Sequence, residues 1–276
     1  MRWTRWALNL SLTLCFCGVF GGCGLSDEAL QLLADADAAY QAGDTGGAIR
    51  HADAFLADNG RSGRAGEAYY LRGAARYDQA KDRDGDPDAL DREACKQARA
   101  DLEQAVARSS TFDLRGKSAL TLGHLAFDTD DIPTADRMYR LAVDSVGKDP
   151  VLGSEAHYRL GCALQRQGKW PDADVWFQKT MFQFPDSAPA RAAAGRVNAN
   201  AWTVQAGSFT ERNNADRAVA ELAAQDATLP ARTVAVLDGR PRYVVYVGRY
   251  RTYEDAHTMR RRVQAFQGDA FVTVTK

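Results

Sequence analysis

The feature that most constrains the fold is an internal repeat, in which small and apolar residues recur from residue 29 to residue 198 with a period of about 34 residues. Within each copy the apolar residues follow helical spacing, so each copy predicts two helices. In the copy at 154–187, small residues stand where two helices can approach closely and large residues fill the space between them. The residues of this copy are His157, Leu160, Gly161, Leu164, Ala173, Phe177 and Pro185.

Three further copies are in phase with this one. The copy at 116–149 keeps Ala119, Leu122, Gly123, Ala135, Tyr139 and Ala142, and a copy that starts near Ala29 keeps Tyr40, Ala48 and Phe55. A copy that starts near Gly66 keeps the period if about thirteen residues, 82–94, are inserted between its helices; it has Tyr69, Gly73, Ala98, Leu102 and Ala105. These copies resemble tetratricopeptide (TPR) repeats. The resemblance implies a helical solenoid over 29–198, closed by a polar-faced capping helix at 186–198, whose groove binds a protein partner that the sequence does not identify.

The inserted segment is acidic, which raises the question of a calcium site. Five of its carboxylates occupy positions 1, 3, 5, 7 and 12 of an EF-hand loop, namely Asp82, Asp84, Asp86, Asp88 and Glu93. However, Pro87 stands where the sharp turn of such a loop needs glycine, and Leu90 offers no ligand at position 9. We therefore predict a solvated acidic loop and no metal, with a calcium site as the alternative.

The N-terminus carries the signature of an exported chain. Arg2 and Arg5 precede an apolar run at 6–20 that is too short to span a bilayer. The segment Phe20-Gly21-Gly22-Cys23 resembles the lipobox of bacterial lipoproteins, although Phe20 replaces the usual leucine. The resemblance implies a signal peptide at 1–22, acylation of Cys23, a tether at 23–28, and attachment by lipid alone to the periplasmic face of the outer membrane. The alternative is an ordinary cleaved signal peptide followed by an incidental cysteine.

From residue 201 onward the pattern changes to short strands and helices. Strands are predicted at 202–206, 233–237, 242–247 and 270–274, with helices at 213–225 and 253–267. The order βαββαβ predicts a four-stranded sheet with both helices on one face, which leaves the other face open. The chain is thus predicted to be an α+β protein of two domains, an all-α solenoid followed by a small ferredoxin-like domain at 201–276.

The C-terminal segment resembles the SPOR (sporulation-related) domain. The matching residues are Trp202, Val204, Gln205, Gly207, Ser208, Phe209, Asn214, Ala215, Leu222, Tyr243, Val245, Val247, Gly248 and Ala256. The resemblance implies binding to peptidoglycan glycan strands that have lost their stem peptides, in cell division or wall remodelling, without catalytic machinery. Gln205 and Ser208 match positions that contact glycan in the family.

Strand alternation extends this candidate site. It places Val204 inward with Tyr243, Val245 and Val247, and places Thr203, Gln205, Arg242, Val244, Tyr246, Phe271 and Thr273 on the open face. The amide of Gln205 can donate to and accept from sugar hydroxyls, and the rings of Tyr246 and Phe271 offer apolar platforms. We therefore predict a glycan site of Gln205, Ser208, Arg242, Tyr246 and Phe271. The alternative is structural: a strand amide, a helix-capping hydroxyl and ordinary exposed rings.

One position departs from the family pattern. Val244 stands where the family usually has arginine, four residues before the glycine of the third strand. Arg242 and Arg249 are the candidates to replace that guanidinium, and the alternative is weaker glycan affinity. Loss of glycan binding would leave an envelope scaffold that acts only through protein contacts.

Other function classes find little support. The formal net charge of −1 favours no nucleic acid as a partner. The sequence has no nucleophile elbow, phosphate loop or paired-cysteine metal motif, so no enzyme activity and no cofactor are predicted. Of the cysteines beyond position 23, Cys95 and Cys162 are predicted to be separate buried thiols.

Overall fold

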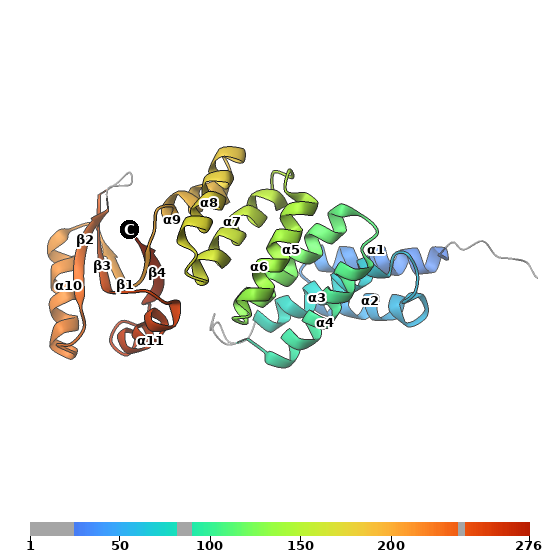
Figure 1. The fold of residues 1–276 in the computed structure, drawn as a ribbon. Helices are drawn as coiled ribbons and strands as arrows, with labels where there is room; N and C mark the ends of the chain where they lie inside the picture. The colour runs from blue at the N-terminus through green and yellow to red at the C-terminus, as the bar shows by residue number, and fades with distance from the viewer. Residues whose placement is uncertain (1–24, 82–89, 237–240) are drawn as a thin grey trace, which may run out of the picture.

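The computed structural model describes residues 25–81, 90–236 and 241–276. Helices make up the first part of the chain and an antiparallel sheet with two helices makes up the second (Figure 1). The helical part contains α1 (Asp27–Gln41), α2 (Thr45–Asn59), α3 (Ala65–Lys81), α4 (Arg92–Arg108), α5 (Phe112–Asp128), α6 (Ile132–Val146), α7 (Leu152–Arg166), α8 (Trp170–Gln183) and α9 (Ala188–Arg196). The second part contains β1 (Ala201–Phe209), α10 (Arg212–Gln225), β2 (Ala231–Val236), β3 (Arg242–Tyr250), α11 (Tyr253–Gln264) and β4 (Phe271–Thr275).

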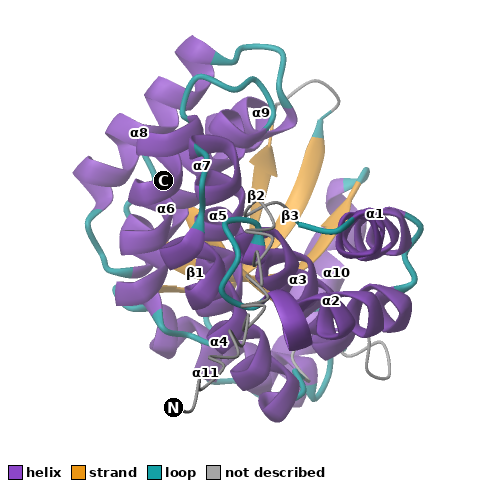
Figure 2. Cartoon of the chain, turned by 90° about the vertical axis from the view of Figure 1, so that its right-hand side faces the viewer, coloured by secondary structure: helices purple, strands orange, loops and turns teal. Residues whose placement is uncertain are grey.

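The helices form antiparallel pairs, and three of these pairs, α1–α2, α5–α6 and α7–α8, are joined by short turns. Each of the three turns contains a residue with positive φ, at Gly43, Asp130 and Gly168, which reverses the chain after the first helix. Side-chain oxygens cap the following helix where Asp44 and Asp131 accept hydrogen bonds from backbone N–H groups. The predicted solenoid of paired helices is therefore confirmed (Figure 2).

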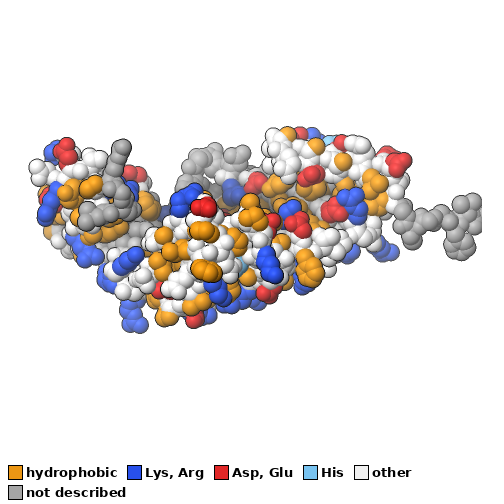
Figure 3. Space-filling model, turned by 90° about the horizontal axis from the view of Figure 1, so that it is seen from above, with side chains coloured by type: hydrophobic (Ala, Val, Ile, Leu, Met, Phe, Trp, Pro, Cys, Tyr) orange, Lys and Arg blue, Asp and Glu red, His pale blue; other side chains and the backbone are white. Residues whose placement is uncertain are grey.

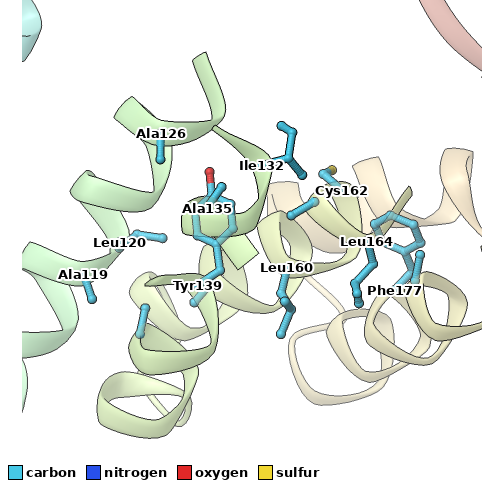
Figure 4. Packing of buried hydrophobic residues seen from close by; sticks show 14 of the residues in the cluster. Ala119, Leu120, Ala126, Ile132, Ala135, Tyr139, Leu160, Cys162, Leu164 and Phe177 are labelled. Atoms are coloured by element: carbon cyan, nitrogen blue, oxygen red, sulfur yellow. The ribbon is translucent and has the colours of Figure 1, made fainter. Parts of the chain in front are cut away.

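Small residues at the repeat positions let the paired helices approach closely. A Cβ placed on Gly123 would lie 2.6 Å from the ring of Tyr139, and one on Gly161 would lie 2.5 Å from the ring of Phe177. Both rings are fully buried in the core that α5–α9 share (Figure 4). The glycines thus make room for the aromatic residue of the second helix, as the repeat pattern predicts.

The C-terminal sheet has the strand order β2-β3-β1-β4 with antiparallel pairing throughout. Inward residues of the sheet, including Val204, Val245 and Val247, pack with Leu222 of α10 and Val263 of α11. Both helices therefore cover the same face, as the strand and helix order predicts. The bounds differ from the prediction mainly at four places. β2 begins at Ala231, two residues before the prediction, and α11 ends at Gln264, three residues before it. β1 and β3 each extend three residues beyond their predicted ends, to Phe209 and Tyr250.

Aromatic contacts join the two parts of the chain. The ring of Trp170 on α8 lies 5.5 Å from that of Trp202 on β1, which in turn contacts Tyr253 at 5.2 Å. The guanidinium of Arg166 at the end of α7 lies over the Tyr253 ring at 3.4 Å from its centroid. The sheet and the last repeat are thus in direct contact across a short connection.

Candidate functional site

The open sheet face carries a row of side chains that crosses all four strands. Gln205 on β1 lies opposite Tyr246 on β3 and opposite Phe271 on β4. On the far side of β3, Tyr246 lies opposite Arg232 of β2. Directly opposed residues have Cα atoms about 4.5–5.5 Å apart, so neighbouring side chains in this row can touch one ligand together. We call these four residues the cross-strand row: Arg232, Tyr246, Gln205 and Phe271.

A bulge in β1 brings Ser208 to the same face as Gln205. In a regular strand, residues three apart point to opposite faces. The pairing of β1 with β3 shifts between Gln205 and Gly207, so that Ser208 lies opposite Val244, two residues from Tyr246. Ser208 is exposed there, next to the cross-strand row. A glycine inside a strand is the signal for such a bulge, and Gly207 provides it.

Arg242 lies apart from this row. It is the first residue of β3, where it pairs with Val236, and it lies four residues before Tyr246. At about 3.3 Å per residue, their Cα atoms are about 13 Å apart along the strand. The structure therefore places three of the five predicted residues in one row, puts Ser208 beside it, and leaves Arg242 at the start of β3, away from the row.

Two residues predicted for the open face are buried. The hydroxyl of Thr203 donates a hydrogen bond to the carbonyl oxygen of Gly248 at 2.7 Å, and its side chain is completely enclosed. Val244 is on the predicted face, between Val234 and Ser208 of the neighbouring strands, but only 4% of it is exposed. Thr203 therefore stabilises the sheet, and Val244 offers little surface to a ligand.

Arg249 and Arg232 have different surroundings. Arg249 donates to the carbonyl oxygen of Lys276 at 2.9 Å and to the side-chain oxygen of Asn200, so it holds the C-terminus against the start of β1. Arg232 is exposed and lies in the row itself. Sequence reasoning missed Arg232 because it began β2 at Thr233. The sequence signal that predicts the earlier start of β2 is the alternation of Arg232 and Val234 with the smaller residues Ala231, Thr233 and Ala235.

A second candidate site is a groove among the first helices of the repeats. A cavity of about 360 Å³ lies between the starts of α1, α3 and α5. Two ion pairs line it, Arg64 with Glu67 at 2.5 Å and Lys117 with Asp113 at 2.9 Å, beside the apolar Leu33 and Leu71. Its mixed lining suits a peptide segment with both apolar and charged side chains.

Metal ligands and membrane-spanning helices were sought among the described residues. Within 25–81, 90–236 and 241–276, no three His, Cys, Asp or Glu side chains are grouped as metal ligands. No helix in these ranges combines the length and hydropathy needed to cross a bilayer. Cys95 and Cys162 are buried free thiols. Asp82, Asp84, Asp86 and Asp88 of the acidic insertion lie outside the described residues, as does Cys23.

Comparison with known families agrees with this sheet geometry. Residues 198–273 match the family model of the SPOR domain. The C-terminal part of this chain is a SPOR domain. In this SPOR domain the cross-strand row lies on the sheet face that α10 and α11 leave uncovered.

Solved structures are similar to part of this chain. They include YrrB, a TPR protein with an unusual peptide-binding site, at 21% identity and a TM-score of 0.46, with 60% of this chain and 74% of YrrB covered. MamA is similar at 18% identity and a TM-score of 0.47, over 62% of this chain and 81% of MamA. The apo form of RapI is similar at 14% identity and a TM-score of 0.49, over 62% of this chain and 47% of RapI. No match to a curated protein was found.

Proposed function

We propose that this chain is a non-catalytic lipoprotein of the bacterial cell envelope that binds peptidoglycan through its SPOR domain and a protein partner through its TPR-like repeats. The preferred ligand is glycan stripped of stem peptides, in wall remodelling or cell division. The observation that carries the proposal is the cross-strand row, which presents an amide, two rings and a guanidinium on one side of a SPOR sheet.

The chemistry of the row suits a sugar chain. The rings of Tyr246 and Phe271 lie on either side of Gln205 and give apolar surfaces on which sugar faces can pack. Between them, Gln205 can donate to and accept from hydroxyl and N-acetyl groups. Arg232 supplies a guanidinium on this face, which compensates for the valine at position 244. Ser208 extends the polar surface beside the row.

The helical part supplies the second contact. The groove between α1, α3 and α5 has the mixed lining expected for a peptide segment of a partner protein. Acylation of Cys23 would attach the chain to the outer membrane, so that lipid and glycan together hold it at the wall. Two attachments on one chain raise the effective concentration of the second and strengthen the whole without any new contact.

The test is co-sedimentation of the chain lacking residues 1–23 with purified peptidoglycan, before and after an amidase removes the stem peptides. We expect binding to rise after amidase treatment. Gln205→Ala and Arg232→Gln should each weaken it about threefold to tenfold, the effect of one hydrogen bond to a ligand. The matched control is Gln225→Ala, an exposed amide on α10 on the other side of the sheet.

The second candidate is a scaffold that has lost glycan binding. The buried valine at position 244, where the family usually has arginine, favours it. Under that function neither peptidoglycan preparation would pull down the chain, and no substitution in the cross-strand row would change the result. That outcome would refute the glycan proposal and leave the groove between α1, α3 and α5 as the candidate binding site.

A further inference from the structure

The helical part has one edge at which the repeats begin and end. Because the helices alternate in direction, the first helix of each repeat starts where the second helix ends. Contacts show this directly: a Cβ on Gly116 of α5 would meet Val146 of α6 at 2.4 Å, and one on Gly66 of α3 would meet the carbonyl of Arg108 at the end of α4 at 2.7 Å. We call this the turn edge, made by the starts of α1, α3, α5 and α7 and the ends of α2, α4, α6 and α8.

Large apolar side chains project from this edge. Phe112 at the start of α5 is 74% exposed, Val151 before α7 is 73% exposed, and Phe182 at the end of α8 is 86% exposed. These are the most exposed large apolar side chains in the described ranges, and they lie at the ends of α5, α7 and α8 that form this edge. Figure 3 looks onto the side of the molecule where the α6–α7 turn and the end of α8 lie in Figure 1, and hydrophobic side chains are visible there.

The same edge is where the chain enters the solenoid. The start of α1 belongs to it, because Leu30, Arg64 and Leu114 line one cavity at the starts of α1, α3 and α5. In the sequence, Cys23 precedes Asp27, the first residue of α1, by only four residues. Four residues span at most about 14 Å, so a bilayer that holds acyl chains on Cys23 must approach the turn edge to within about that distance.

We propose that the turn edge lies on the surface of the bilayer and that Phe112, Val151 and Phe182 enter its interfacial layer. The proposal rests on the lipid anchor of the proposed function. The lipid anchor then holds one end of the turn edge at the membrane, and the exposed side chains of the edge set the tilt of the solenoid. Apolar side chains at a membrane surface bury about 5–10 Å into the headgroup region, a depth that side chains at helix ends can reach. The SPOR domain then projects from the last repeat, fixed by the contact of Trp170 with Trp202.

A depth measurement with a replaceable anchor tests this. The chain from Gly24 onward carries an N-terminal hexahistidine tag and is held on phosphatidylethanolamine–phosphatidylglycerol vesicles that contain a nickel-chelating lipid. Phe112→Cys, Val151→Cys and Phe182→Cys are each labelled with an environment-sensitive fluorophore, and quenching by nitroxide-bearing lipids is measured. The matched control is Val175→Cys, an exposed apolar position on α8. It lies seven residues before Phe182, on the same helical face and about 10 Å farther from the edge.

We expect the three edge labels to be quenched at least about twofold more than the label at position 175, because only they reach the headgroup layer. Equal quenching at all four positions overturns the proposal. A change in edge fluorescence that needs no vesicles and grows with protein concentration also overturns it, since a second copy then covers the edge. Acylation of Cys23 is measured separately, by the mass of the processed precursor. The anchor and the edge can therefore fail independently of each other.

Discussion

Replacing Gly161 by alanine tests how closely α7 and α8 must approach. The added Cβ would lie 2.5 Å, 2.8 Å and 3.0 Å from three ring carbons of Phe177. Carbon atoms in contact normally lie about 3.5–4.0 Å apart, so the ring has to move. It cannot move freely, because Phe177 is fully buried in the core of α5–α9. The substitution therefore overpacks the contact between the two helices.

The expected magnitude follows from two opposing effects. Overpacking a tight core typically costs about 1–3 kcal/mol. Alanine in a helix is favoured over glycine by about 1 kcal/mol. Because the clash at Gly161 involves a ring with no free space, we expect the upper part of the first range and a net loss of about 1–2 kcal/mol in the free energy of unfolding.

The matched control is Gly195→Ala in α9. A Cβ at Gly195 would meet no atom of the described residues within 4 Å, so only the helix preference acts. This variant should be neutral or more stable by up to about 1 kcal/mol. Urea unfolding followed by far-UV circular dichroism measures both variants, compared at equal m-values. If Gly161→Ala is as stable as Gly195→Ala, the close approach of α7 and α8 is not required and our account of the repeat glycines is wrong.

Two further predictions concern buried charge. Asp101 is buried and accepts hydrogen bonds from Arg72 at 2.5 Å and from Arg76 at 2.6 Å. Asp101→Asn should therefore lower the free energy of unfolding, measured in urea, by about 2–4 kcal/mol. The control Glu67→Gln, in the more exposed pair with Arg64, should change that free energy by less than about 1 kcal/mol. Burial lowers the pKa of His157 and lowers the pKa of His124 to about 3, so both bind protons more readily in the unfolded chain. Their contribution to stability is therefore complete above about pH 6.5 and falls at lower pH. The free energy of unfolding in urea should fall less between about pH 7.5 and about pH 5 in His157→Leu than in the unchanged chain. An equal fall in the two proteins would show that His157 does not contribute to the pH dependence.

The repeat architecture follows from local pattern because its contacts are local. In three of the helix pairs the contacting residues are separated by one short turn, and the positions of Gly161 and Phe177 recur in the copy with Gly123 and Tyr139. Helix caps and turn residues are likewise encoded within a few positions, as Asp131 and Asp130 show. Such features can be read from the sequence without knowing what lies far along the chain.

The sheet face was only partly predictable. Alternation placed Gln205, Tyr246 and Phe271 on one face, and their pairing makes them neighbours. Alternation alone cannot place Arg232, whose position depends on where β2 begins and on its register with β3. It also left open the role of Arg249, which the structure assigns to the C-terminus through Lys276 and Asn200.

The sequence by itself determined the period of the repeats, the order of strands and helices, and the resemblance of the C-terminal segment to the SPOR domain. Tertiary structure alone decided which residues meet across strands, that Thr203 and Val244 are buried, and that Phe112 and Phe182 project from one edge. The physical reason is the range of the contacts. Period and strand order are set by neighbours in sequence, whereas register, burial and surface clustering depend on segments that meet only after the chain has folded.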